Sequence, residues 1–277
     1  MHTGRRGWVT VLVNWGLARY ERTRAALAGR HERPASAFAS PTSRAAGNVA
    51  SLVVLNWQRP ENVRQILDRY VSFDGLDDII VWNNNGNTPF VYLHPKVRCI
   101  NSDEFGLNTR WLGSLLARHS CVIVHDDDLI CDEATIDGLI AYHRADPDRT
   151  YTLHGRNPTR SNQYADKVDH VAEPTECDVH LTRVTCVNRR WVPRYFDALA
   201  AMGIDITPQA GGGEDIVISY AIRAATGRRP LVVPGSYEDL IAPHALANRY
   251  GSQAEERTVI MRACQQWFEQ ERLDQPS

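Results

Sequence analysis

The stretch Val122-Ile123-Val124-His125-Asp126-Asp127-Asp128-Leu129-Ile130 decides how the rest of the chain is interpreted. Its apolar beginning, Cys121 to Val124, is typical of a buried strand. Three consecutive carboxylates follow, and a cation or solvent must relieve their mutual repulsion. Carboxylates at the end of a strand suit a hard divalent cation such as Mg²⁺ or Mn²⁺, which also binds phosphate oxygens. The pattern predicts a metal and diphosphate site, although an acidic turn before a helix starting near Asp132 and Glu133 explains the same residues.

The composition is that of an ordinary globular protein. The chain has 277 residues, of which 43% are hydrophobic and 23% charged, enough for one large domain or two small ones. The formal net charge of −2 predicts no general attraction to nucleic acid or to anionic membranes. No apolar run approaches the ~20 residues that span a bilayer, and no secretory signal pattern is evident, so we expect a cytoplasmic protein. The six cysteines show no CxxC pairing, which favours reduced thiols over a disulfide framework.

Two regions differ in how clearly they are patterned. Residues 1–50 are expected to form an N-terminal extension and linker, because 34–48 are rich in Ala, Ser, Pro and Thr with little apolar pattern. From residue 51 onward, short apolar runs alternate with helical spacing. This alternation predicts that the first half after residue 51 is α/β with a mostly parallel sheet.

Polar clusters follow three of the predicted strands, at Asn56 to Arg59, Asn83 to Asn85 and Asp126 to Asp128. In a parallel sheet, ligands bind at the carboxyl ends of the strands. Asn83 and Asn84 are therefore candidates to bind a nucleobase or ribose, or they simply form the turn. Arg59 and Arg110 are candidates to bind phosphate, since the guanidinium fork is bidentate, or they are surface charges.

The second half is predicted to be more mixed. Glycines 211 to 213 precede Glu214 and Asp215, which open a predicted helix over 216–225. Glycines let a backbone approach a ligand closely, so a catalytic role is one interpretation of the two acids. The other is that they interact favourably with the helix dipole. Further segments are predicted as helices at 134–145, 194–202 and 254–272, strands at 151–154, 179–187 and 230–233, and a polar irregular loop at 155–175.

Taken in order, these motifs resemble those of GT-A glycosyltransferases, and in particular the exostosin-type domain of glycosyltransferase family 64. The resemblance covers roughly residues 51 to 267 and rests on Val53-Val-Leu-Asn-Trp-Gln-Arg-Pro60, Ile80-Val-Trp-Asn-Asn84, the Asn108 to Arg110 motif, the Asp-x-Asp of the triplet, and Glu214-Asp215-Ile216. It implies a GT-A fold with a Rossmann-like, mostly parallel sheet. Residues 51–130 would then form the nucleotide-sugar-binding half and 131–277 the acceptor and catalytic half.

The resemblance also implies a nucleotide-sugar donor, usually a UDP-sugar, the cofactor Mn²⁺ (or Mg²⁺), and retention of configuration at the anomeric carbon. Asp128 would bind the metal with Asp126, while Asp126 and Asp127 would meet ribose, sugar or metal-bound water. Asp215, with Glu214, would lie by the anomeric carbon, and Arg249, or in second place Arg257, would bind the diphosphate. The remaining candidate donor-binding residues are Asn56, Arg59, Asn83, Asn84, Asn108 and Arg110.

Two departures from the family and several alternatives remain at this point. Gly213 stands where family members have a cysteine, and Glu214 is the first acid of the pair. An inverting, family 2-like enzyme would use Asp215 as general base. A non-catalytic nucleotide- or glycan-binding module would keep the fold, and nucleotidyl or phosphoryl transfer would use a similar metal. The acceptor is left open as a glycan, a lipid-linked sugar, a protein or a modified DNA base, for which Arg189, Arg190 and Arg194 offer a basic patch.

Overall fold

The computed structural model describes residues 49–103, 106–205, 212–241 and 253–274. The chain divides into two compact units, Met1–Arg44 and Ala45–Ser277, and all described residues belong to the second. The predicted extension over 1–50 therefore lies almost entirely outside the described residues. Within the described part, no helix combines the length and apolar character needed to cross a bilayer.

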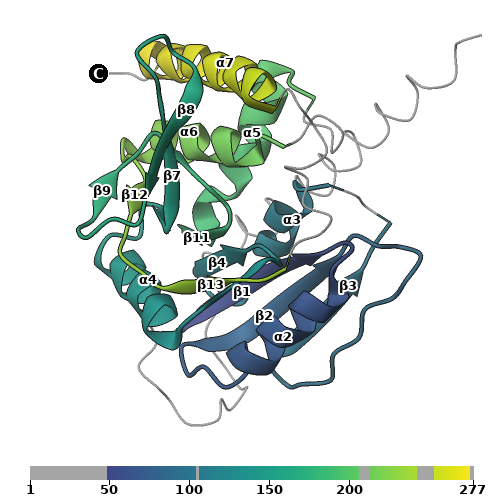
Figure 1. Cartoon of the computed structure of the whole chain (residues 1–277). Helices are drawn as coiled ribbons and strands as arrows, with labels where there is room; N and C mark the ends of the chain where they lie inside the picture. The colour runs from purple at the N-terminus through teal and green to yellow at the C-terminus, as the bar shows by residue number, and fades with distance from the viewer. Residues whose placement is uncertain (1–48, 104–105, 206–211, 242–252, 275–277) are drawn as a thin grey trace, which may run out of the picture. The chain divides into compact units, whose positions relative to one another are not determined.

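One half of the main sheet is parallel (Figure 1). Its strands lie in the order β3 (Val97–Asn101), β2 (Leu76–Asn83), β1 (Ala50–Asn56) and β4 (Cys121–His125). Every residue of β1 and β4 is buried, because both faces of the sheet are covered. This explains why these segments are continuous apolar runs rather than alternating ones.

The other half of the sheet is mixed. After β4 come β11 (Val184–Asn188), β6 (Tyr151–Thr152), β12 (Leu231–Val232) and β9 (Thr175–Glu176). Strand β11 runs antiparallel to β4, with Val184 opposite His125. The residues just before Val184 therefore lie beside the Asp triplet. The α/β prediction, a mostly parallel sheet with a mixed second half, is confirmed.

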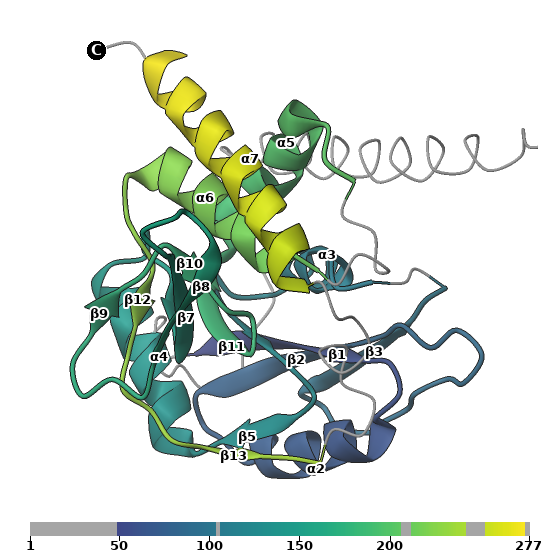
Figure 2. The ribbon, with the colours of Figure 1, turned by 45° about the horizontal axis from the view of Figure 1, so that its top comes forward.

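The sheet separates two apolar cores, because successive side chains of a strand point to opposite faces. Leu52 and Val54 of β1 pack into the first core, whereas Val53 packs into the second. Helices α2 (Pro60–Tyr70) and α4 (Glu133–Ala145) cover the first core. The second core is covered by α3 (Thr109–Leu115), α5 (Pro193–Met202), α6 (Glu214–Thr226) and α7 (Gln253–Asp274), and a short 3-10 helix, Arg189–Trp191, precedes α5. Figure 2 shows α2 below the parallel strands, with α3 and α7 above them.

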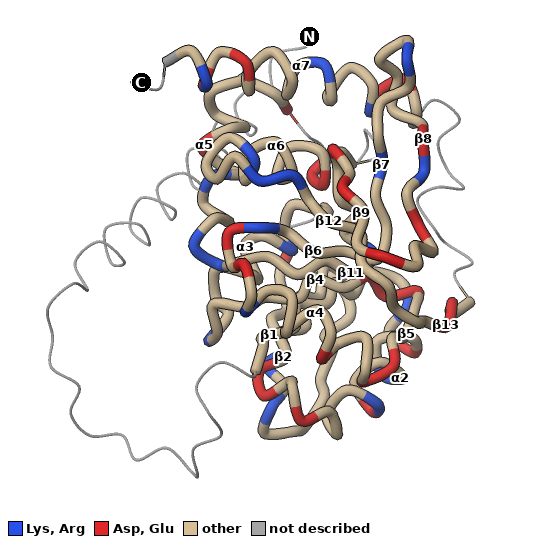
Figure 3. The backbone as a smooth tube through the Cα atoms, turned by 90° about the vertical axis from the view of Figure 1, so that its left-hand side faces the viewer, with Lys and Arg blue, Asp and Glu red and all other residues tan. Residues whose placement is uncertain are grey.

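The segment predicted as an irregular loop, 155–175, instead forms a hairpin of β7 (His154–Pro158) and β8 (Tyr164–Asp169). Its turn is closed by Thr159 N–H, which donates to Gln163 O at 2.9 Å. Charges of both signs lie along the hairpin (Figure 3). Because an antiparallel pair can leave one face in solvent, its strands need no continuous apolar run, and the sequence pattern hid them.

The predicted strand over 179–187 is two strands, β10 (Val179–His180) and β11. Strand β10 leaves the main sheet and pairs with β7, and Leu181 N–H between them donates to His154 O at 2.8 Å. A small two-stranded sheet of β5 (Leu129–Cys131) and β13 (Tyr237–Asp239) follows the Asp triplet directly. The break after β10 places residues 181–183 in a loop rather than inside a strand.

Candidate functional site

The carboxyl ends of β1 and β2 are joined by their terminal asparagines. Asn56 is paired in register with Asn83, and its Nδ2 donates to Asn83 Oδ1 at 2.8 Å. The backbone N–H of Asn84 donates to Asn56 O at 2.7 Å. The Oδ1 atom of Asn56 is buried and has no hydrogen-bond partner. An unsatisfied buried acceptor is costly, and this one suits a donor group of a ligand.

Asn83 and Asn84 hold loops together. Asn83 Nδ2 lies 2.9 Å from Thr88 O and 2.8 Å from Asn101 Oδ1. Asn84 Oδ1 accepts a 3.1 Å hydrogen bond from Thr109 Oγ1, at the start of α3. These bonds match the interpretation that the asparagines form the turn. Nucleoside binding by either of them stays a prediction.

Each carboxylate of the triplet faces a guanidinium group. Asp126 Oδ1 lies 2.9 Å from Arg110 Nη1, and Asp127 Oδ1 lies 2.7 Å from Arg59 Nη2. Asp128 lies between two arginines, with Oδ2 at 3.3 Å from Arg59 Nη1 and Oδ1 at 3.9 Å from Arg183 Nη2. The predicted residues Arg59 and Arg110 are therefore placed at the triplet.

The start of the triplet is fixed by a buried hydrogen-bond chain. Cys131 N–H donates to Tyr70 Oη at 2.7 Å, so the Tyr70 hydroxyl proton points to His125 Nε2, 2.8 Å away. His125 Nδ1–H then donates to Asp126 O at 2.6 Å. Burial lowers the pKa of His125 to about 4, which keeps the ring neutral and this donor order intact. Asp126 N–H in turn donates to Arg183 O at 2.9 Å.

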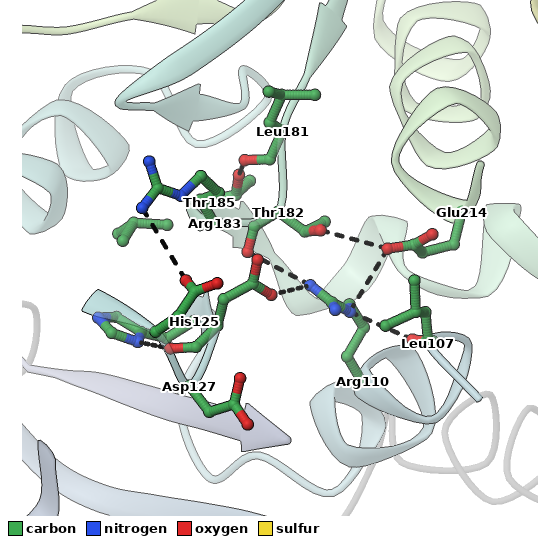
Figure 4. Close-up of polar contacts among 12 residues, drawn as sticks. Leu107, Arg110, His125, Asp127, Leu181, Thr182, Arg183, Thr185 and Glu214 are labelled. Atoms are coloured by element: carbon green, nitrogen blue, oxygen red, sulfur yellow. Dashed lines mark hydrogen bonds and ion pairs between the residues drawn. The ribbon is translucent and has the colours of Figure 1, made fainter. Parts of the chain in front are cut away.

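Arg110 connects the triplet to the second acidic stretch (Figure 4). Its side chain is 3% exposed, and its Nε lies 3.6 Å from Glu214 Oε1. The guanidinium also donates to the backbone oxygens of Thr182 at 3.3 Å and Leu107 at 3.2 Å. One buried cation therefore joins Asp126, at the end of β4, to Glu214, at the start of α6.

Glu214 and Asp215 open α6 and are almost fully buried. Glu214 Oε2 accepts from Gly213 N–H at 3.0 Å, and Oε1 accepts from Thr182 Oγ1 at 3.2 Å. Asp215 Oδ1 accepts from Ile216 N–H at 2.9 Å. Burial, followed by the charge of Glu214, raises the pKa of Asp215 to about 7, against the opposing charge of Arg257. Asp215 is thus able to change protonation state near neutral pH.

Gly213 is required by the backbone at this point. Its φ is +115°, a conformation that other residues rarely adopt. A Cβ atom there would lie 2.6 Å from Ile260 Cδ1. Both observations explain why this chain has glycine at position 213.

Helix α7 and strand β8 each place one side chain near Asp215, namely Arg257 and Tyr164. The guanidinium carbon of Arg257 lies 5.7 Å from the centroid of the Tyr164 ring. Burial would lower the pKa of Arg257, but the charges of Asp215, Tyr164 and Glu214 raise it. The Tyr164 hydroxyl is buried without a hydrogen-bond partner. Arg257, the second choice for the diphosphate-binding arginine, is thus placed near Asp215, whereas Arg249 lies outside the described residues.

Asn108 lies at the N-terminus of α3, next to the bridging arginine. Its Oδ1 accepts a 2.6 Å hydrogen bond from Tyr195 Oη. This bond ties α3 to α5 and so helps to position Arg110. A direct contact between Asn108 and a donor stays a prediction.

The triplet fits a divalent cation that takes few ligands from protein. Among the described residues, no group of three His, Cys, Asp or Glu side chains forms a metal-binding cluster. Asp128 Oδ1 is nevertheless buried and accepts no hydrogen bond. Burial and then the charge of Asp126 raise the pKa of Asp128, and burial raises that of Asp127 to about 7. Crowded carboxylates with one open oxygen suit Mn²⁺ or Mg²⁺, whose other ligands are water and phosphate.

Several residues at the site were not found from sequence, namely Tyr70, Tyr164, Thr182 and Arg183. The antiparallel pairing of β11 with β4 places Thr182 and Arg183 beside the Asp triplet. A single sequence does not reveal this pairing. Tyr164 was hidden in the polar hairpin. Tyr70 lies on the apolar stripe of α2, where it is indistinguishable from an ordinary core residue.

Comparisons with known proteins bear on the family and the fold of the chain. The family model described as "Glycosyl transferase family 64 domain" matches residues 50–275. A search of curated protein sequences gives no match. Among solved structures, the chain is similar to one described as a crystal structure of GalNAc-T7 with UDP, GalNAc and Mn2+, at 13% identity and a TM-score of 0.51. The match covers 71% of this chain but only 44% of that one, and at this identity it shows the GT-A fold alone.

Proposed function

The chain belongs to glycosyltransferase family 64, and from this premise we propose that it transfers a sugar from a UDP-sugar to an acceptor, with a divalent metal and with retention of anomeric configuration. The observation that carries the proposal is the bridge made by Arg110 between Asp126 and Glu214. It unites a carboxylate triplet suited to a metal with two buried acids suited to a reacting sugar.

In this proposal, Asp128 and Asp126 would hold Mn²⁺, and Arg59, which lies beside Asp127 and Asp128, would contact the diphosphate. The bound metal supplies charge compensation for the leaving diphosphate. Asn56 offers its unpaired Oδ1 to a donor group of the nucleoside. The solved GT-A relative, described with UDP, GalNAc and Mn2+, supports this choice of donor and metal.

Asp215 is the proposed catalytic residue. When the diphosphate leaves, positive charge develops at the anomeric carbon, and a fixed carboxylate beside that carbon stabilises it. Asp215 is fixed by the Ile216 N–H and by its burial. Arg257 opposes the rise in its pKa and so favours the charged form that this role requires.

A second candidate function is inverting transfer, and the pKa of Asp215 favours it. A carboxylate with a pKa of about 7 is suited to accept a proton from an acceptor hydroxyl at neutral pH. The anomeric configuration of the first-formed product, read by NMR, separates the two mechanisms. Retention of configuration supports the proposal. Inversion of configuration would assign Asp215 the role of general base.

A nucleotide-sugar panel tests the function without knowledge of the acceptor. We expect one or more UDP-sugars to raise the melting temperature only when Mn²⁺ or Mg²⁺ is present, and to be hydrolysed slowly to free sugar and UDP. Stabilisation without any hydrolysis would point to a binding module. Cleavage of a UDP-sugar to UMP and sugar 1-phosphate would point to nucleotidyl transfer. The acceptor screen then covers glycans, lipid-linked sugars, proteins and modified DNA bases.

A further inference from the structure

Arg183 lies on the opposite side of the triplet from Glu214, in the loop before β11 (Figure 4). Its side chain is 29% exposed, and Nη2 lies 3.9 Å from Asp128 Oδ1. The same nitrogen pairs with Asp239 of β13, and Nη1 lies 3.4 Å from His154 Nε2. The guanidinium carbon lies 5.2 Å from the centroid of the Tyr237 ring. Arg183 is therefore held by three neighbours besides Asp128.

The contact between Arg183 and Asp128 differs from an ordinary ion pair. At 3.9 Å the two groups attract each other, but the distance is too long for a hydrogen bond. Asp128 Oδ1 consequently stays without a hydrogen-bond partner. The carboxylate oxygen is open to a metal, and a guanidinium group lies beside it.

We propose that Arg183 is a diphosphate-binding residue of the donor site. The proposal rests on the function proposed above. A nucleoside diphosphate bound to a metal on Asp128 has its anionic oxygens close to that carboxylate, where Arg183 already lies. A planar guanidinium binds two phosphate oxygens at once. The contacts with Asp239 and Tyr237 would keep the Arg183 side chain at the site if Asp128 bound a metal.

This role makes Arg183 act with opposite sign on two ligands. In the absence of nucleotide, its positive charge disfavours a second cation on Asp128, so it weakens the binding of metal alone. In the presence of nucleotide, the same charge attracts the diphosphate and strengthens binding. A residue that only supports the fold would not change the two affinities in opposite directions.

The test uses Arg183→Gln, which removes the charge, and Arg183→Lys, which keeps the charge but loses the fork. Binding of Mn²⁺ alone is measured by electron paramagnetic resonance. Calorimetry at saturating Mn²⁺ then measures the affinities of the wild type for UDP, GDP, CDP and ADP. The nucleoside diphosphate that binds the wild type most tightly is used for all variants. We expect Arg183→Gln to bind Mn²⁺ about threefold more tightly and the nucleoside diphosphate about tenfold more weakly. Arg183→Lys should fall between the wild type and Arg183→Gln for the diphosphate.

Arg149→Gln is the matched control, since Arg149 also faces two carboxylates, Glu176 at 3.0 Å and Asp146 at 3.7 Å. This control variant should leave both affinities unchanged. Uridine, which has no phosphate, should bind the wild type and the Arg183 variants with the same affinity. Nucleoside diphosphate affinity within twofold of wild type in Arg183→Gln overturns the assignment. If the wild type binds no nucleoside diphosphate with Mn²⁺, the proposed function and this assignment are overturned together. A preference for GDP over UDP would change the donor and leave Arg183 in its role.

Discussion

The two acidic stretches of the site, Asp126 to Asp128 and Glu214 to Asp215, differ in how their charge is compensated. The triplet lies at the end of a strand and faces guanidinium groups from Arg59, Arg110 and Arg183. The second stretch is buried at the start of α6 and is held chiefly by hydrogen bonds from Thr182 and from backbone N–H groups.

The difference separates two tasks within one site. Arginines beside a carboxylate triplet create a place where a metal and a diphosphate can exchange partners with them. Asp215, a buried carboxylate held by the backbone N–H of Ile216, is instead suited to a single reacting atom, because its charge is felt most strongly where water is excluded. Arg110 is the only one of these arginines described in contact with both stretches.

Removal of the bridge should have the largest effect. Arg110→Gln leaves the buried Glu214 and the partly exposed Asp126 without their shared cation. Loss of one partner of a buried pair costs about 3 kcal/mol of unfolding free energy or more, measurable by urea unfolding. The control Arg194→Gln removes an exposed i,i+3 partner of Asp197 and should cost little. Equal small losses in both variants would show that Arg110 does not hold the stretches together.

A change at Asp215 alone should affect chemistry and spare binding. Asp215→Asn keeps the shape and removes the charge, so turnover should fall roughly 100-fold, since the interaction strengthens mainly in the transition state. Donor affinity should stay within a few-fold. Asparagine keeps an oxygen that can accept the hydrogen bond from Ile216 N–H, so near-normal turnover would mean that Asp215 serves only to stabilise the first turn of α6.

The same variant should reveal the burial of Asp215 through the pH dependence of stability. The pKa of Asp215 is raised from 3.8 to about 7 in the folded chain, so between these values unfolding releases its proton and stability falls as the pH rises. Asp215→Asn removes this loss. Its unfolding free energy should exceed that of wild type by about 1 kcal/mol or more at pH 8 and by less at pH 5. A difference that does not vary with pH would contradict the raised pKa.

The fold was predictable where the chain is buried on both sides. The strands around Val53 and Val124 are continuous apolar runs, and the α2 stripe of Val63, Ile66 and Leu67 follows helical spacing. The half-solvated hairpin of β7 and β8 carries no such signal, because its stability depends on pairing and on contacts with α7, such as Tyr164 N–H to Thr258 Oγ1 at 3.0 Å.

The site was predictable only where it follows a strand or begins a helix. Asp126 to Asp128 and Glu214 are visible in the sequence because their chemistry is local. Arg183 is not, because it reaches the triplet through strand pairing between residues about 60 positions apart. The asparagines show a different limit, since one residue type serves both turns and ligands.

The smallest effect is expected outside both acidic stretches, at Asn84. If it binds the nucleoside, Asn84→Ala should weaken the binding of uridine by about 1 kcal/mol, the size of one hydrogen bond. If it only holds the loop through Thr109, uridine binding should be unchanged while stability falls by a similar amount. Calorimetry with uridine and thermal unfolding of the same variant decide between the two roles.

The division of tasks is tested most directly by calorimetry of UDP with and without Mn²⁺ on Asp128→Ala and Asp215→Asn. Asp128 offers the open carboxylate oxygen, so its variant should lose the part of UDP affinity that depends on Mn²⁺. Asp215→Asn should bind UDP with Mn²⁺ within a few-fold of wild type. If Asp128→Ala keeps wild-type UDP affinity and still requires Mn²⁺, the metal does not bind at the triplet and the account is contradicted.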